Sequence, residues 1–247
     1  MRVLGVIPAR LGSIRLPNKP LQLLAGEPLI TRVIQRVMEH DLTDAVVVAT
    51  DSERVVEVAV AAGARAVLTD PSHLSGTDRV AEVAARAEFA AAEIVVNVQG
   101  DEPFLPRGAL AGAIDRVEQG DDIGTAAAPL DPALVTDPAR VKVVTDARGR
   151  ALYFSRSVIP HRREPTDDVT GLYWQHLGIY AYSRAALARW VSAQPSEAEL
   201  AERLEQLRAL HCGMSIGVAR LDEPALPGVD TADDLRRAEA HWHALQG

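Results

Sequence analysis

The sequence predicts an α/β fold built on a mostly parallel β-sheet, with helices on both faces and an inserted β-hairpin region. In the first half, short apolar runs alternate with segments of helical periodicity, and no flexible linker interrupts them. Strands separated by helices form βαβ units, which produce parallel sheets. After about residue 130 the pattern changes to strand-like runs that flank a turn. We therefore expect one domain over residues 1–247, with the hairpin region at about 130–182.

The first half contains four expected strands and the helices between them. Pro28 suits the first turn of a helix, Asp51 or Ser52 can cap the next helix, and Gly63 would end it. The alanine-rich stretches favour helix over linker, because alanine has the highest helix propensity. The expected strands are residues 3–7, 45–49, 66–68 and 94–98, and the helical segments are residues 29–38, 52–62 and 81–92, with a loop at residues 73–79 after the third strand.

In the second half, residues 141–144 and 152–155 flank a turn at 146–149, which predicts a β-hairpin. Residues 177–182 form another expected strand. Two helix starts carry the spacing of a capping box, in which two residues three apart bind each other's main chain. These pairs, and the apolar stripe that we expect to follow the first of them, are Ser196 and Glu199, Thr231 and Asp234, and the stripe Leu200, Leu204 and Leu207.

Composition excludes several classes of protein. The formal net charge of -8 at pH 7 disfavours nonspecific nucleic-acid binding, which depends on a basic surface. No run approaches the ~18 uncharged apolar residues of a membrane span, so we expect no membrane partner. Cys212 is the single cysteine, so no disulfide can form within the chain. The N-terminus has no pattern of a signal peptide, and the expected compartment is the cytoplasm.

In proteins with an open parallel sheet, ligands bind at the carboxyl-terminal ends of the strands. The first expected strand runs into a loop that contains Arg10, Arg15 and Lys19 among small residues. Cations and free main-chain amides suit a triphosphate. The loop lacks the Gly-Lys-Ser/Thr ending of a Walker motif and the glycine spacing of a dinucleotide fingerprint. A solvated loop whose cations pair with surface carboxylates is an equally open interpretation.

Two aspartates are candidate ligands of Mg²⁺, which prefers hard oxygen donors and keeps several waters. Asp101 follows the fourth strand in Gln99-Gly100-Asp101-Glu102-Pro103, and Asp230 precedes a helix in Pro227-Gly228-Val229-Asp230-Thr231. The alternative is a turn for Asp101 and a helix cap for Asp230. The presence of two such carboxylates at strand ends favours the metal.

Beyond these patterns, the residues resemble a known family. The segments Ile7-Pro8-Ala9-Arg10, Lys19-Pro20-Leu21 and Val98-Gln99-Gly100-Asp101-Glu102-Pro103 resemble the sugar-nucleotide cytidylyltransferases. An ordered set along nearly the whole chain resembles the 3-deoxy-manno-octulosonate cytidylyltransferases (CMP-Kdo synthetases). This set is Ser75-Gly76-Thr77-Asp78-Arg79, Val141-Lys142-Val143-Val144, Ala151-Leu152-Tyr153-Phe154-Ser155-Arg156, His176-Leu177-Gly178-Ile179-Tyr180, Leu204-Glu205-Gln206-Leu207-Arg208 and Gly228-Val229-Asp230-Thr231.

The resemblance implies a Rossmann-like nucleotide-diphospho-sugar transferase fold and a reaction. The anomeric hydroxyl of 3-deoxy-D-manno-octulosonate (Kdo) would attack the α-phosphate of CTP, giving pyrophosphate and CMP-Kdo for lipopolysaccharide synthesis. It also implies a Mg²⁺ cofactor, a cytoplasmic homodimer, and a role of the 130–182 region in sugar binding and dimerisation.

The resemblance also assigns residues to roles, with Arg15, Lys19, Asp101 and Asp230 as the catalytic set. It implies nucleotide binding by Ala9, Arg10, Ser13, Arg15, Lys19, Ser75, Gly76, Arg79 and Asp101. It implies Mg²⁺ binding by Asp101 and Asp230, and sugar binding by Gln99, Arg156, His176, Tyr180, Glu205 and Gln206.

This sequence departs from the family pattern at a few positions. Asp78 stands where the family has Glu, Gln175 where it has Lys or Arg, and Asp137-Pro138-Ala139 where it has Asn-Pro-Asn. Because Gln175 removes a positive charge beside a sugar ligand, the substrate could be another acidic sugar, such as amino-Kdo or a sialic-acid-like nonulosonate. A non-catalytic sugar-nucleotide-binding protein is the alternative from another class, but such a protein has no need of two metal carboxylates.

The sequence gives no signal for a dedicated general base. His176 could act as one, but a lone histidine near a strand is more often a hydrogen-bonded structural residue. Activation of the sugar hydroxyl by the metal is therefore the preferred mechanism.

Overall fold

The computed structural model describes residues 2–13, 15–164 and 168–246. Ile14, which belongs to the first loop, lies outside the described residues. Contacts divide the chain into two compact units, residues 1–105 with 226–247 (unit 1) and residues 106–225 (unit 2). The single domain over residues 1–247 remains a prediction.

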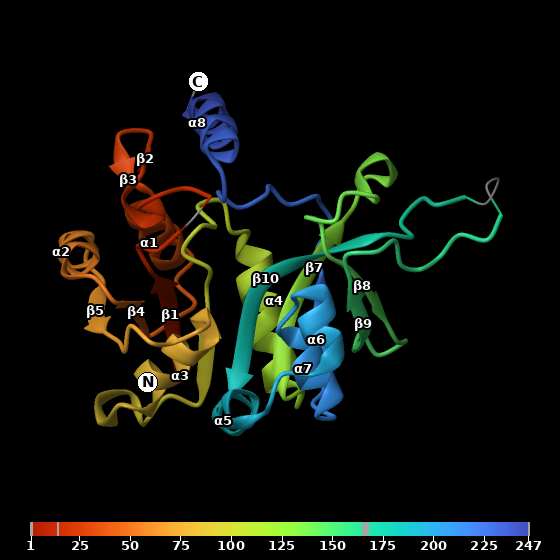
Figure 1. The fold of residues 1–247 in the computed structure, drawn as a ribbon, viewed down its shortest axis with the longest axis horizontal. Coiled ribbons are helices and arrows are strands. Elements are labelled where there is room, and N and C mark those ends of the chain that lie inside the picture. The colour runs from red at the N-terminus through yellow and green to blue at the C-terminus, as the bar shows by residue number, and fades with distance from the viewer. Residues whose placement is uncertain (1, 14, 165–167, 247) are drawn as a thin grey trace. The chain divides into compact units, whose positions relative to one another are not determined.

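Unit 1 contains a four-stranded parallel sheet in the order β6-β1-β4-β5. Helices or 3₁₀ turns connect its strands, and the small antiparallel β2–β3 pair precedes the first long helix (Figure 1). The elements are β1 (Val3–Ala9), η1 (Lys19–Leu21), β2 (Leu23–Leu24), β3 (Glu27–Pro28), α1 (Leu29–Glu39), β4 (Ala45–Thr50), α2 (Glu53–Ala61), β5 (Arg65–Leu68), α3 (Gly76–Ala85), η2 (Ala87–Phe89), β6 (Ile94–Asn97) and α8 (Ala232–Gln246).

The four expected strands and the first two helices of the N-terminal half are confirmed. Strands β1, β4 and β6 are buried along nearly their whole length, as parallel strands covered on both faces are, whereas the edge strand β5 is partly exposed. On α1, Leu29, Ile30, Val33, Ile34 and Val37 are buried at the spacing of one helical face. Pro28 takes the N-cap position immediately before that helix, and Ser52 takes it before α2.

The strand order of unit 1 determines where a ligand can bind. The chain passes outward from β1 to β4 and β5, then returns to the other side of β1 with β6. Between β1 and β6 the two connections leave in opposite directions, which opens a crevice at the carboxyl ends of these strands. The loops that follow β1 and β6 therefore meet at the expected ligand position.

Two predictions for this half are wrong in whole or in part. The helix expected at residues 81–92 ends at Ala85, and only the short turn η2 follows it. Residues 75–79 were expected in a loop, but they form the start of α3. The Ser75 hydroxyl accepts a hydrogen bond from the Asp78 main-chain N–H, and the Asp78 carboxylate accepts one from the Ser75 N–H. This capping box starts the helix at Gly76, before the alanine-rich stretch that was expected to be helical.

Unit 2 contains a mixed sheet in which β11 pairs with β7 in parallel and β10 pairs with β7 antiparallel. The antiparallel hairpin β8–β9 confirms the expected hairpin, and β8 also pairs with β10. The elements are α4 (Arg107–Glu118), β7 (Ile123–Pro129), η3 (Pro132–Leu134), β8 (Lys142–Thr145), β9 (Ala151–Ser155), β10 (Trp174–Ser183), α5 (Arg184–Ser192), α6 (Glu197–Glu202), α7 (Gln206–His211) and β11 (Ile216–Arg220).

The two capping boxes expected in the C-terminal half are confirmed. Ser196 and Glu199 bind each other's main chain at the start of α6, and Thr231 and Asp234 do so before α8. The apolar stripe after the first box is wrong in part. Arg203 adopts a left-handed conformation with φ of 54°, which ends α6 and changes the direction of the chain before α7. Leu200 is consequently 54% exposed, whereas Leu204 and Leu207 are buried as expected.

Within the parts of the chain that the structure describes, no helix is both long enough and apolar enough to span a membrane.

Candidate functional site

Four of the expected site residues form one ionic cluster in unit 1. The Lys19 ammonium donates a short hydrogen bond to Asp101 Oδ2 and a second one, of 3.0 Å, to Asp230 Oδ1. Arg15 Nη2 lies 3.1 Å from Asp230 Oδ2. Burial by itself would lower the pKa of Lys19, but the charges and hydrogen bonds of the two aspartates outweigh it and raise this pKa. Lys19 therefore stays charged at neutral pH.

The main chain brings these residues together from three distant segments. Lys19 opens η1 after the first loop, Asp101 follows β6, and Asp230 precedes α8. The Val229 N–H donates a 2.8 Å hydrogen bond to the Asp101 carbonyl oxygen, which ties the last two segments directly. The two carboxylates thus converge on one ammonium group, although only Asp101 closely follows a strand, since β11 ends at Arg220, well before Asp230. Their role as metal ligands stays a prediction.

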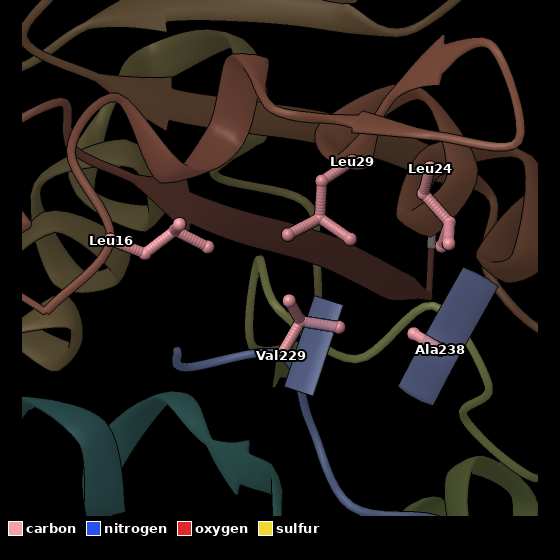
Figure 2. Close-up of a cluster of buried hydrophobic side chains, with 5 residues drawn as sticks. All are labelled: Leu16, Leu24, Leu29, Val229 and Ala238. Atoms are coloured by element: carbon pink, nitrogen blue, oxygen red, sulfur yellow. The ribbon is translucent and has the colours of Figure 1, made fainter. Parts of the chain in front are cut away.

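An apolar cluster packs the first loop and the turn before α8 into one core. Leu16, Leu24, Leu29, Val229 and Ala238 are all buried in it (Figure 2). Leu16 lies between Arg15 and Lys19 in the chain, and Val229 directly precedes Asp230. The cluster therefore anchors the loop that carries the cations and the turn that carries Asp230 to the same core.

Two glycines allow the segments of the cluster to approach closely. A Cβ atom at Gly100 would lie 2.8 Å from the Pro8 carbonyl oxygen, so only glycine lets the loop after β6 contact the end of β1. A Cβ atom at Gly228 would lie 2.9 Å from Glu102 Oε1. The Glu102 carboxyl group is packed against Gly228, and its removal from water, together with the charges of Asp101 and Asp230, raises its pKa to about 8.

The residues present fit a Mg²⁺ ion, although the described residues contain no group of three or more acidic, histidine or cysteine side chains that could hold a metal. Asp101 and Asp230 share one cation, the Lys19 ammonium, so their oxygens already converge on a positive charge. Mg²⁺ is commonly bound by one or two carboxylates, with waters and substrate phosphates completing its six ligands. Two converging carboxylates are therefore a sufficient protein contribution.

The remaining residues of the first loop lie along its path from β1. Ala9 is the last residue of β1 and is buried, whereas Arg10 is exposed. The Ser13 hydroxyl accepts a 3.4 Å hydrogen bond from the Leu16 N–H. Their contact with a nucleotide is untested and remains a prediction.

The expected nucleotide residues after β5 have structural contacts of their own. Arg79 is only 3% exposed, and its guanidinium donates to Asp51 Oδ2 and to the Thr69 hydroxyl. The Ser75 side chain caps α3, and a Cβ atom at Gly76 would lie 3.2 Å from Pro8 Cγ at the end of β1. The structure thus places the start of α3 beside the first loop, with Arg79 directed into the interior.

Five of the expected sugar residues lie in unit 2, and the sixth, Gln99, lies in unit 1 after β6, where its side-chain amide is 3.5 Å from Asn97 Oδ1. His176 and Tyr180 are neighbours on β10, with ring centroids 5.4 Å apart. Both are buried. Burial lowers the pKa of His176 to about 3, and burial, together with the nearby Tyr182 and Glu205, raises the pKa of Tyr180 well above its usual value. Both side chains are therefore neutral at physiological pH.

His176 has the hydrogen bond of a structural histidine. Its Nε2 lies 3.0 Å from the Thr125 hydroxyl, whose single proton has the Ile179 carbonyl oxygen as its nearest acceptor at 2.7 Å. Nε2 then donates to Thr125, and the imidazole is held as the neutral tautomer protonated at that atom.

The Arg156 side chain binds the main-chain oxygens of three residues. Its guanidinium donates to the carbonyl oxygens of Pro138, Glu202 and Arg203. Gln206 is buried at the start of α7, next to Glu205. The predicted contacts of these residues with a sugar acid are untested.

The residue patterns missed three buried or half-buried charged groups around these sites, Glu102, Lys142 and Glu202. Glu102 stands beside an expected metal ligand but has no signal of its own in the sequence. Lys142 interrupts the strand pattern Val141-Lys142-Val143-Val144, and a charge in an otherwise apolar strand is a detectable signal. Glu202 acts through tertiary contacts that no local pattern indicates.

Comparisons with known proteins show what the whole chain is similar to. Residues 4–216 match the family model described as cytidylyltransferase. A 3-deoxy-manno-octulosonate cytidylyltransferase of Gemmatimonas aurantiaca is 52% identical over 99% of this chain and 96% of that protein. One of Methylococcus capsulatus is 45% identical over 96% of this chain and 95% of that protein.

Among solved structures, a CMP:2-keto-3-deoxy-manno-octonic acid synthetase complexed with CTP has a TM-score of 0.90 and 37% identity. The match covers 99% of this chain and all of that chain.

Proposed function

The chain belongs to the 3-deoxy-manno-octulosonate cytidylyltransferase family, and we propose that it transfers CMP from CTP to the anomeric hydroxyl of Kdo, releasing pyrophosphate. Its fold is the nucleotide-diphospho-sugar transferase fold of that family. The observation that carries the proposal is the cluster of Lys19, Asp101 and Asp230 between the loops that follow β1 and β6. This is the position where a Rossmann-like sheet binds a nucleotide.

The acidic and basic residues of the cluster would have different roles in the transfer of CMP. Asp101 and Asp230 would hold Mg²⁺, which when bound polarises the α-phosphate and lowers the pKa of the sugar hydroxyl. Lys19 and Arg15 carry fixed positive charges beside these carboxylates. Such charges orient the triphosphate and stabilise the negative charge that grows on the pyrophosphate leaving group.

Other residues of unit 1 would complete the nucleotide site. Ala9, Arg10 and Ser13 belong to the first loop, where main-chain amides and the Arg10 charge suit the phosphates. Gly76 approaches Pro8 at the end of β1, directly before that loop, which supports a cytidine position beside the start of α3. Because its guanidinium contacts Asp51 and Thr69, Arg79 would shape this pocket from inside.

The sugar residues of the proposal are Gln99, Arg156, His176, Tyr180, Glu205 and Gln206. Neutral, hydrogen-bonding groups such as His176 and Tyr180 suit sugar hydroxyls, and a guanidinium such as Arg156 suits a carboxylate. Arg140 Nη1 donates a 2.8 Å hydrogen bond to Gln175 Oε1. The Arg140 guanidinium therefore provides a positive charge beside Gln175, although Gln175 itself replaces a basic residue of the family pattern.

Release of pyrophosphate on mixing the protein with CTP, Mg²⁺ and Kdo tests the proposal. We expect release that needs all three components, and CTP to be preferred over ATP and GTP. A panel with amino-Kdo and a nonulosonate identifies the sugar, since preferred turnover of either would replace Kdo as the substrate. CTP binding without pyrophosphate release with any sugar acid would favour the non-catalytic binding protein.

Three wider features belong to the same proposal. The product CMP-Kdo would enter lipopolysaccharide synthesis. CTP is a nucleotide of the cytoplasm, so the reaction would take place there. A homodimer that uses the 130–182 region is tested by light scattering after size exclusion, with a monomeric mass as the contrary result.

A further inference from the structure

Lys142 is a charged side chain in the interior of unit 2. It stands on β8 with an exposed fraction of 0%, between Gln175 on β10 and Ser155 on β9. An ammonium group in a protein interior is costly unless hydrogen bonds replace its lost water. Burial accordingly lowers the pKa of Lys142. An apolar side chain at this strand position would avoid the free-energy cost of removing a charge from water, so the presence of a lysine needs an explanation.

The ammonium group is satisfied by the main chain. Lys142 Nζ donates to the carbonyl oxygens of Arg156 at 2.5 Å, Arg140 at 2.7 Å and Asp137 at 3.3 Å. An ammonium group has three protons, and these three acceptors use all of them. Two of the acceptors belong to the segment that enters β8, and the third belongs to the residue that follows β9. Lys142 therefore ties together two segments that no β-ladder joins at this point.

Arg156 extends the same network to a third segment. Its guanidinium donates to the carbonyl oxygens of Pro138, Glu202 and Arg203, at 2.8, 2.7 and 3.3 Å. The Glu202 carboxylate in turn accepts hydrogen bonds from the Ser155 hydroxyl and the Arg156 N–H. Segments 137–140, 155–156 and 202–203 thus form one hydrogen-bonded unit, with the Lys142 ammonium at its buried end.

The three segments adjoin residues that the proposed function assigns to the sugar. Arg156 is itself one of them, Glu205 and Gln206 follow segment 202–203, and Arg140 binds Gln175 beside His176. A shift of one segment would therefore move several of these side chains together.

We propose that Lys142 is a positioning residue of the sugar-acid site, where its buried ammonium fixes the main chain that carries Arg140 and Arg156. The inference rests on the proposed function. Lys142 has no free donor and no exposed surface, so it acts through Arg156 and its neighbours and does not touch the sugar itself. Small displacements of groups that orient a substrate are enough to weaken binding and turnover.

Steady-state kinetics of two variants test the inference. Lys142→Met keeps the length of the side chain but leaves three carbonyl groups without a donor. We expect its KM for Kdo to rise roughly tenfold or more, the equivalent of about one lost hydrogen bond, while its KM for CTP changes less than about twofold. Lys142→Gln retains two amide protons and should give an intermediate KM for Kdo. Val143→Ala, at a buried position next in the same strand, is the control for loss of stability alone.

The outcomes separate the possibilities. A KM for Kdo that rises in Lys142→Met, less in Lys142→Gln and not in Val143→Ala supports the positioning role. Equal changes in both KM values, a rise in Val143→Ala of the same size, or failure of both Lys142 variants to fold would overturn it in favour of a purely structural role. The wild-type protein in the same assay tests the proposed function separately, because absence of Kdo-dependent turnover there concerns the substrate and not Lys142.

Discussion

Among single residues, Asp101 and Asp230 offer the most direct test of the metal assignment. Replacement of either by Asn keeps the shape of the side chain and its capacity to form a turn or a cap, but removes the charge. We expect Mg²⁺-dependent pyrophosphate release to fall by roughly a hundredfold or more, because the effect of a lost ligand should exceed that of a lost outer-sphere partner. Thermal unfolding should stay close to that of the wild type.

Asp233→Asn is the matched control, since Asp233 lies in the first turn of α8 with an exposed side chain. It should retain normal turnover and Mg²⁺ dependence. Active Asp101→Asn and Asp230→Asn proteins with an ordinary response to Mg²⁺ would remove both residues from the metal site.

His176 should make stability depend on pH. Its pKa is lowered by burial from 6.5 to about 3 in the folded protein. Between these pH values the unfolded chain binds a proton at His176 that the folded protein does not bind. The contribution of His176 to the free energy of unfolding is therefore fully present above pH 6.5 and is lost as the pH falls. From pH 6.5 to 5 the loss should be about 2 kcal/mol, at 1.36 kcal/mol for each pH unit.

The measurement is urea unfolding at pH 7 and pH 5 in wild-type protein and His176→Gln. The Gln side chain can still donate to Thr125 but does not titrate, so the loss on acidification should shrink by about 2 kcal/mol. His211→Gln, at an exposed position, should leave the loss unchanged. An undiminished loss in His176→Gln would mean that other groups cause the acid sensitivity.

Among the elements, the β2 strand and helix α8 determine how firmly Asp230 is anchored. Leu24 is fully buried in the apolar cluster of Figure 2, the Ala25 N–H donates to Glu239 of α8, and the Arg32 guanidinium lies over the Trp242 ring. Segments near the two ends of the chain are thus packed together (Figure 1). Loss of this packing should weaken the support of Val229, and with it the position of Asp230.

Leu24→Ala should therefore destabilise the protein by about 2–5 kcal/mol, the usual range for a buried leucine. Leu23, which is 59% exposed on the same strand, provides the control, and Leu23→Ala should change stability by less than about 0.5 kcal/mol. Chemical denaturation measures both. Equal effects of the two substitutions would show that α8 does not depend on this cluster.

Elements with strong local patterns could be predicted from the sequence, and others could not. The strands of the parallel sheet are continuous apolar runs, and the helix starts at Ser196 and Thr231 carry capping boxes, so both followed from local chemistry. Ser75 and Asp78 have the same spacing and cap α3, although this segment was expected to be a loop. The break at Arg203 has no signal in the sequence, because a left-handed arginine is sustained by tertiary contacts such as the bond that Arg156 donates to its carbonyl oxygen.

At the scale of the whole molecule, the position of the site could be predicted from the sequence, but the burial and the pKa values of its residues could not. Strand order places the loops after β1 and β6 together, so Lys19 and Asp101 follow from topology. The raised pKa of Glu102 and the burial of Lys142 arise from contacts between segments distant in sequence, which no local pattern contains. Roles of residues toward the sugar came only from resemblance, because a sugar hydroxyl can be bound by almost any polar side chain.

The single domain expected for residues 1–247 predicts one cooperative unfolding transition. Unit 1 and unit 2 each have a core, represented by Leu24 and Phe154, both fully buried. In a single domain, calorimetric and van't Hoff enthalpies agree, and a cavity in either core shifts the same transition. Leu24→Ala and Phe154→Ala should each lower the temperature of one common calorimetric peak by several degrees, roughly 2–4 °C for each kcal/mol lost in a chain of this size. Two peaks, of which each substitution moves only one, would show instead that the units unfold as separate domains.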